Sequence, residues 1–176
     1  YTEKQIGTDP QSIDSDGDGL SDSIEFELGT DPRHWDSDRD LLGDGIEITY
    51  RCSPLSDDTD TDELTDFTEF LLNSDANSTD TDNDGLDDKT EFDFNSNLLI
   101  ADSDGDLMFD ALEYDEGTNP NSLDSDGDDV VDGIEKIYGT DTLLADSDGD
   151  RALDGLEIAL WLNPLCNDTD GDGLGD

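Results

Sequence analysis

The sequence predicts a repeat or solenoid fold that is mostly loop with short α-helices and has no large sheet. Three observations predict it. The segment Asp-(Ser/Thr)-Asp-x-Asp recurs eight times at a constant spacing of 22 residues in a chain of 176. Only 31% of the residues are hydrophobic, which is too few for one conventional core. Most repeats also have a short segment with apolar residues four apart, a spacing typical of a helix.

The composition excludes several classes of function. Seven Lys and Arg residues oppose 52 acidic residues, so the net charge is −45. Nucleic acid is excluded as a direct partner because both molecules would be polyanions. No apolar run is long enough to span a membrane. One His and two distant Cys supply no nucleophile–base pair, so we expect a protein that is not an enzyme.

The acidic residues follow a fixed pattern within each repeat. With Asp14 as position 1, Asp occupies positions 1, 3, 5 and 9 and Glu occupies position 12 in every copy. This is the spacing of an EF-hand calcium loop, in which these side chains and the position 7 carbonyl surround the ion. A solvated acidic tail has no reason to keep such a pattern. Mg²⁺ needs tight octahedral geometry and keeps its waters, so five carboxylates favour Ca²⁺.

We therefore expect about one Ca²⁺ per repeat, with room for additional ions, along a single array over residues 1–176. The predicted loops start at residues 14, 36, 58, 80, 102, 124, 146 and 168. The predicted ligands are Asp14, Asp16, Asp18, Leu20, Asp22 and Glu25; Asp36, Asp38, Asp40, Leu42, Asp44 and Glu47; Asp58, Asp60, Asp62, Leu64, Asp66 and Glu69; Asp80, Asp82, Asp84, Leu86, Asp88 and Glu91; Asp102, Asp104, Asp106, Met108, Asp110 and Glu113; Asp124, Asp126, Asp128, Val130, Asp132 and Glu135; Asp146, Asp148, Asp150, Ala152, Asp154 and Glu157; and Asp168, Asp170, Asp172, Leu174, Asp176 and Glu3.

Each loop is predicted to lead into a helix of about two turns over positions 9–15. Positions 11 and 15 are mostly apolar and share one helical face. A helix this short is marginal alone, so we expect that face to pack on neighbouring repeats. Position 16 is often Gly, as at Gly29 and Gly139, which predicts a left-handed C-cap.

Three further positions carry local predictions. Position 6 needs a sharp turn, and a positive φ at a residue such as Leu41 or Arg151 costs about 1 kcal/mol. Position 2 is always Ser or Thr, and we expect its hydroxyl to cap the backbone. Position 18 is mostly Asp or Asn, which indicates either an Asx turn or an extra oxygen for an adjacent calcium.

The segment from Asp14 to Glu25, followed by Gly29-Thr30-Asp31-Pro32, closely resembles the thrombospondin type 3 repeat in its bacterial and archaeal form. The resemblance extends over the whole chain. It implies calcium-dependent folding, an extracellular or cell-surface location, and a role as a structural rod, stalk or filament. The alternative is a calcium-dependent docking or adhesion module of a larger surface protein.

The two ends of the chain are complementary in register. Tyr1 stands at position 10 and Asp176 at position 9, so Glu3 has the place of the Glu that the eighth loop lacks. Either the array continues as one longer polypeptide, or chains join head to tail, with Glu3 of one chain closing the last loop of the next. The expected partner is therefore the chain itself.

Two residue types leave alternatives open. Asn77 and Asn167 begin N-glycosylation sequons and are candidate glycan sites. Cys52 and Cys166 lie five repeats apart, so we expect either free thiols or a bond between chains.

Overall fold

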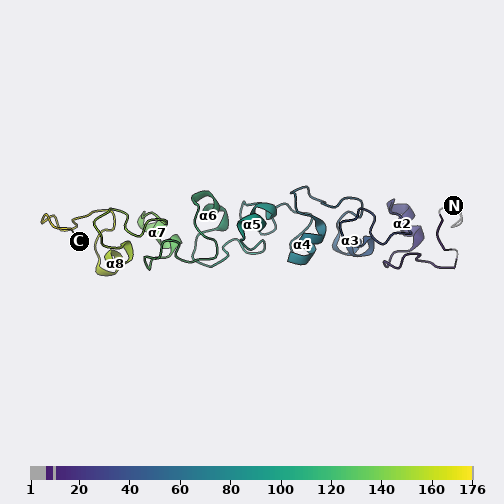
Figure 1. Ribbon diagram of the computed structural model, residues 1–176, viewed down its shortest axis with the longest axis horizontal. Coiled ribbons are helices and arrows are strands. Elements are labelled where there is room, and N and C mark those ends of the chain that lie inside the picture. Colours follow the sequence, from purple (N-terminus) through teal and green to yellow (C-terminus); the bar gives the residue numbers. More distant parts are fainter. Residues whose placement is uncertain (1–6, 10, 176) are drawn as a thin grey trace. The chain divides into compact units, whose positions relative to one another are not determined.

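The computed structural model describes residues 7–9 and 11–175. Along these residues seven α-helices of seven residues each follow one another every 22 residues, and no strand is present (Figure 1). The helices are α2 (Asp22–Leu28), α3 (Asp44–Tyr50), α4 (Asp66–Leu72), α5 (Asp88–Phe94), α6 (Asp110–Glu116), α7 (Asp132–Tyr138) and α8 (Asp154–Leu160). Each covers positions 9–15 of its repeat. The predicted fold class and helix bounds are thus confirmed.

Each helix ends at a residue in the left-handed conformation. After α2, Gly29 has φ 90° and donates its N–H to the Glu25 carbonyl at 2.7 Å. After α3 and α4 the same conformation occurs at Arg51 (φ 73°) and Asn73 (φ 65°). The position 16 cap is therefore confirmed, and it forms even where the residue is not Gly. The acidic first turn also suits the positive end of the helix dipole.

Two left-handed residues give each loop its curl. In the second loop Leu41 at position 6 has φ 88°, as predicted, and Arg39 at position 4 has φ 76°, which the sequence analysis missed. The Asp36 carboxylate holds both residues, because it accepts the Arg39 N–H at 2.6 Å and the Leu41 N–H at 3.2 Å. A position 1 aspartate therefore fixes the backbone conformation that brings its own loop together.

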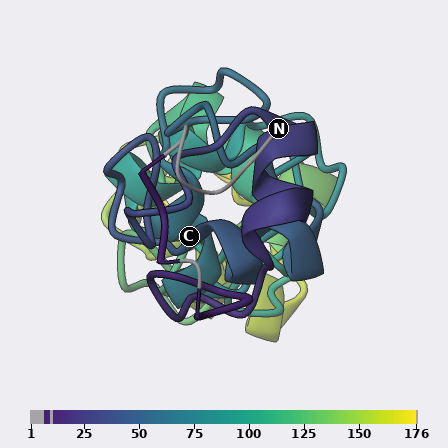
Figure 2. The same cartoon turned by 90° about the vertical axis from the view of Figure 1, so that its right-hand side faces the viewer.

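The chain forms two compact units. One comprises Tyr1–Thr81 with Asp87–Lys89, and the other Asp82–Leu86 with Thr90–Asp176. Within the first, α2, α3 and α4 follow one another, and within the second so do α6, α7 and α8 (Figure 1). In Figure 2, α2 is the dark purple ribbon that faces the viewer, and α3 lies beside it. Consecutive repeats within a unit are thus direct neighbours.

The apolar core is small and is built from single positions of each repeat. Position 7 is buried from Leu20 to Val130, with Leu42 and Met108 only 2% exposed. Ala152 is half-buried, and Leu174 in the last loop is exposed. Position 19 is buried in every described copy, although the sequence analysis did not single it out. Its described residues are Pro32, Pro54, Ala76, Leu98, Pro120, Thr142 and Pro164.

Neighbouring helices contact each other through position 15 of one repeat and position 13 of the next. Two of these contacts are edge-to-face aromatic pairs, with ring centroids 5.0 and 5.3 Å apart, and one is an ion pair. The pairs are Tyr50–Phe70, Phe94–Tyr114 and Glu116–Lys136. Glu116 is the one acidic residue among the apolar residues of position 15, and its basic partner explains it.

The expected packing of position 11 is wrong. Four of its five apolar residues, Ile24, Ile46, Leu112 and Leu156, are 42–52% exposed, and Ile134 is half-buried. The physical reason is the rotation of each helix about its axis. The position 10 N–H is bonded to the preceding loop, as at Gly45 and Asp18, and this turns position 13 toward the neighbour and position 11 outward.

Candidate metal centres

The first three aspartates of a loop converge on one point. Carboxylate oxygens of Asp14, Asp16 and Asp18 lie within 4.8 Å of one another, and the loops starting at Asp36 and Asp58 repeat this arrangement. Backbone donors hold the side chains in place. Asp16 accepts the Asp18 N–H at 3.4 Å, and Asp18 accepts the Leu20 N–H at 2.7 Å. Positions 1, 3 and 5 thus lie together in these loops, and their role as metal ligands stays a prediction.

The described position 12 glutamates are fully buried. All seven from Glu25 to Glu157 have no exposed surface. In five of them at least one carboxylate oxygen accepts no hydrogen bond: Glu25, Glu47, Glu69, Glu113 and Glu135. A buried carboxylate without donors is costly, so such a cluster needs either protons or a cation.

Burial and neighbouring aspartates raise the pKa of these glutamates far above the ordinary value of 4.5. The pKa rises to about 9 for Glu47 and Glu69 and to about 8 for Glu25, with burial the larger cause. Near Glu47 the charges of Asp38 and Asp40 add to this effect. Without a cation the folded loops therefore hold protons at neutral pH.

Position 3 supplies a second set of buried oxygens without donors. The Oδ2 atom of each of these residues is buried and accepts no hydrogen bond: Asp16, Asp38, Asp60, Asp104, Asp126 and Asp148. Burial also raises the pKa of Asp38, Asp60 and Asp126 to about 6. Hard oxygen donors grouped in this way are the ligands that Ca²⁺ takes, so the residues fit the ion.

Position 9 has a different environment from the one that the EF-hand pattern implies. Both oxygens of Asp44 accept hydrogen bonds from Ser37 of its own loop, from the N–H and from the hydroxyl, each at 2.7 Å. Asp44 also forms a group with Asp18 and Glu25 of the preceding repeat, within 4.8 Å. The position 9 aspartate thus lies at the junction between repeats, and its role as a ligand of its own loop stays a prediction.

The remaining predicted ligands are placed as follows. In the second unit Asp84 of the loop starting at Asp80 accepts the N–H of Ala111 at 3.0 Å, and calcium binding by that loop stays a prediction. In the last loop Asp168 is half-buried and Asp170 and Asp172 are exposed. Glu3 and Asp176 lie outside the described residues, so the closure of the eighth site stays a prediction. So does ligation by the position 7 carbonyls.

The comparison with known families finds a match within the first complete repeat. Residues 14–32 match the family model of the bacterial TSP3 repeat. This confirms the resemblance to the thrombospondin type 3 repeat family. No curated protein and no solved structure matches the chain significantly. The TSP3 match indicates a calcium-binding structural repeat, and the clustered carboxylates fit it.

TSP3 repeats typically occur in extracellular proteins. Among the described residues, no helix has the length and apolar character needed to cross a lipid bilayer.

Positions 2 and 18 of the repeat form local hydrogen bonds. The position 2 hydroxyl, as in Ser37, accepts the N–H of Asp31 at 2.9 Å while it donates to Asp44. It caps the backbone, as predicted, and also links two repeats. The position 18 side chain forms an Asx turn, since Asp9 accepts the Gln11 N–H at 2.9 Å.

Neither cysteine forms a disulfide within the chain. Cys52 is buried, and burial with nearby acids raises its pKa to about 12, so it acts as a packing residue. Cys166 is half-buried. The sequon residues Asn77 and Asn167 are both exposed.

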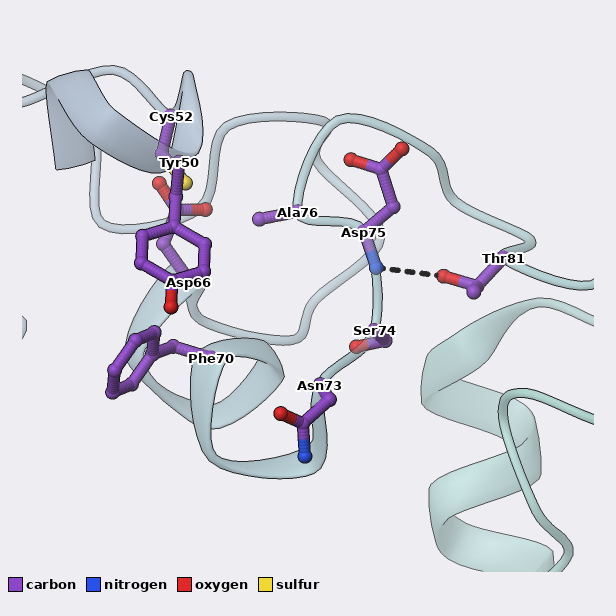
Figure 3. A pocket seen from close by; sticks show the side chains of 9 residues that line it. All are labelled: Tyr50, Cys52, Asp66, Phe70, Asn73, Ser74, Asp75, Ala76 and Thr81. Atoms are coloured by element: carbon purple, nitrogen blue, oxygen red, sulfur yellow. Dashed lines mark hydrogen bonds between the residues drawn. The ribbon is translucent and has the colours of Figure 1, made fainter. Parts of the chain in front are cut away.

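A pocket of about 220 Å³ lies beside α4 in the first unit (Figure 3). Tyr50 and Phe70 form one wall, and the Asp75 N–H bonds the Thr81 hydroxyl at 2.9 Å opposite them. Cys52 and Ala76 complete an apolar interior. The volume is below about 300 Å³, the lower end of the range for ligand pockets, so we interpret the pocket as a gap in the packing between the repeats of α3 and α4.

Proposed function

We propose that the protein is a calcium-binding structural element whose repeats are folded by Ca²⁺. One observation carries the proposal: Glu25, Glu47, Glu69, Glu113 and Glu135 are fully buried among aspartates, and each has at least one carboxylate oxygen that accepts no hydrogen bond. Nothing but protons or cations offsets such a cluster, and oxygen ligands of this number and type suit Ca²⁺.

The mechanism is the cancellation of charge. Two carboxylates about 5 Å apart repel each other by roughly 3 kcal/mol at an effective dielectric constant of 20. Five carboxylates per loop make several such pairs, so the empty loop resists closure. One Ca²⁺ in each of eight loops changes the net charge from −45 to −45 + 16 = −29, which is still acidic.

Additional ions have a place at the junctions. Asp18 and Glu25 of one repeat and Asp44 of the next offer oxygens within 4.8 Å of one another. Glu25 and Asp44 have no exposed surface. A second ion there would bridge two repeats and neutralise the negative charge that remains after one Ca²⁺ has bound in the loop.

The array is proposed to serve outside the cell as a rod, stalk or filament. The same kinds of contact between neighbouring repeats occur in both units: position 15 packs against position 13 of the next repeat, and the position 5 carboxylate accepts the position 10 N–H. Further copies of the repeat would therefore lengthen the array in the same way. The extension is either one longer polypeptide or head-to-tail association of chains. The exposed Asn77 and Asn167 offer sites for glycans on such a surface.

Chelation tests the calcium proposal. A site whose ligand is present at ten times its dissociation constant gains about 1.4 kcal/mol, so eight sites contribute roughly 11 kcal/mol. We expect EDTA to abolish the helical circular dichroism signal and added Ca²⁺ to restore it, whereas Mg²⁺ restores little. A helical signal that is unchanged by EDTA would refute the proposal.

A second candidate, a calcium-dependent docking or adhesion module, is favoured by the apolar residues that the helices leave exposed. Phe26, Ile137 and Trp161 are 47%, 74% and 93% exposed. Binding of a partner that EDTA abolishes, measured by pull-down with the folded chain as bait, would support it. Retention of the partner in EDTA would count against it.

A further inference from the structure

The position 5 aspartate binds two repeats at once. Asp106 accepts the Met108 N–H of its own loop at 2.7 Å with Oδ1, and the Gly133 N–H of the next helix, α7, at 3.0 Å with Oδ2. Four other copies make the same bond to a residue 27 positions later, at 2.9–3.0 Å: Asp18 to Gly45, Asp40 to Phe67, Asp84 to Ala111 and Asp128 to Gly155.

The following helix also touches the loop with its backbone. A Cβ on Gly133 would lie 2.4 Å from the Asp106 carbonyl oxygen, and Gly45 and Gly155 have the same close approach. A second link runs through Ser125, which accepts the Asn119 N–H at 3.1 Å and donates to the Asp132 carboxylate. These five loops are therefore joined directly to the start of the next helix.

We infer that the position 5 aspartate couples each loop to the helix that follows it, so that order in one loop stabilises the next helix toward the C-terminus. Asp106 acts as a positioning residue: its carboxylate sits at the first turn of α7, where N–H groups have no partner within the helix. The dependence of this coupling on calcium rests on the proposed function, whereas the hydrogen bond itself does not.

The test compares two isosteric variants of one loop in the full chain, Asp106→Asn and Asp104→Asn. Both remove one carboxylate from the same predicted site, but the hydrogen bond to α7 comes from Asp106, whereas Asp104 interacts with Asp132 of α7 through its charge. With hydrogen exchange measured in millimolar Ca²⁺, we expect amides of α7 to exchange about tenfold faster in Asp106→Asn, the effect of losing one charge-assisted hydrogen bond, and α5 to be unchanged. In Asp104→Asn the change in α7 should be clearly smaller. Equal effects of the two variants on α7, or equal effects of Asp106→Asn on α5 and α7, would overturn the inference.

Gly133→Ala keeps the test decisive if Asp106→Asn fails to fold. It changes no predicted ligand, but the added Cβ forces α7 away from Asp106. Ala is the better helix former, so a purely local effect would slow exchange in α7, whereas loss of the junction speeds it. Slower exchange would overturn the inference. If the native chain exchanges equally with and without Ca²⁺, the proposed function fails, yet the contrast between these variants still tests the coupling.

Discussion

At the scale of single residues, the loop separates the carboxylates into two kinds. Position 12 glutamates such as Glu47 and Glu69 have at least one buried oxygen that accepts no hydrogen bond, whereas the described position 9 aspartates have both oxygens occupied by the position 2 N–H and hydroxyl. Asp66, for example, accepts two hydrogen bonds from Thr59 at 2.8 and 2.6 Å, while Oε2 of Glu69 accepts none. A cation is therefore the main partner available to Glu69.

This difference predicts a ranking of variants. Glu69→Gln should lower the calcium bound per chain by about one ion, because it removes a ligand with two oxygens. Asp66→Asn should lower it less, since that side chain is held mainly by Thr59. Calcium per chain after dialysis, measured by atomic emission, gives the answer.

Glu63→Gln is the matched control, because Glu63 is an exposed acid of the same loop outside the ligand positions. It removes the same charge and should leave the bound calcium unchanged. Equal loss from Glu69→Gln and Asp66→Asn would contradict the ranking.

At the scale of the helices, stability comes from the contact between position 15 of one helix and position 13 of the next. Aromatic edge-to-face pairs contribute about 0.5–1.5 kcal/mol beyond their buried area, whereas partly exposed ion pairs contribute about 0–1 kcal/mol. The Glu116–Lys136 side chains are 31% and 34% exposed, which places that pair in the weaker class. This junction is thus weaker than its aromatic counterparts.

Replacing the ion pair by the aromatic pair of the preceding junction should stabilise the second unit. We expect Glu116→Phe with Lys136→Tyr to raise the free energy of unfolding in Ca²⁺ by about 0.5–1 kcal/mol, whereas each single variant lowers it. Urea unfolding of the four proteins forms the double-variant cycle. A coupling energy of zero would show that the two positions do not interact.

At the scale of the whole molecule, the carboxylate charges of each loop oppose its closure until calcium or protons neutralise them. The pKa of the buried glutamates, about 8 for Glu25 and about 9 for Glu47 and Glu69, lies above the unfolded value of 4.5. Between these values the metal-free folded chain binds more protons than the unfolded chain. The stability of the metal-free fold therefore falls as the pH rises from about 4.5 to about 9.

We expect the metal-stripped chain to have more helix at pH 5 than at pH 8, as measured by circular dichroism. In millimolar Ca²⁺ we expect the opposite order: the thermal unfolding midpoint should be higher at pH 8 than at pH 5, because the ion binds only deprotonated carboxylates. Metal-free helix content that stays constant or rises with pH would contradict this linkage.

Most of the repeat unit could be predicted from the sequence because its determinants are local. The spacing of Asp14, Asp16 and Asp18 brings three carboxylates together within five residues, and the left-handed residues at positions 6 and 16 follow from the turns that the loop and helix end require. The helix bounds, the Asx turn and the capping hydroxyl at position 2 are local in the same sense.

What joins one repeat to the next was decided only by the tertiary structure. The contacts between Tyr50 and Phe70 and between Asp106 and Gly133 link residues 20 and 27 apart, so they depend on how far each repeat is rotated against its neighbour. The 22-residue period of the sequence does not specify that rotation. For this reason position 11 was expected to pack on neighbouring repeats, whereas the structure leaves most of its apolar residues exposed. Local charge and turn chemistry thus determine the unit, while backbone hydrogen bonds from one loop to the next helix determine how units pack.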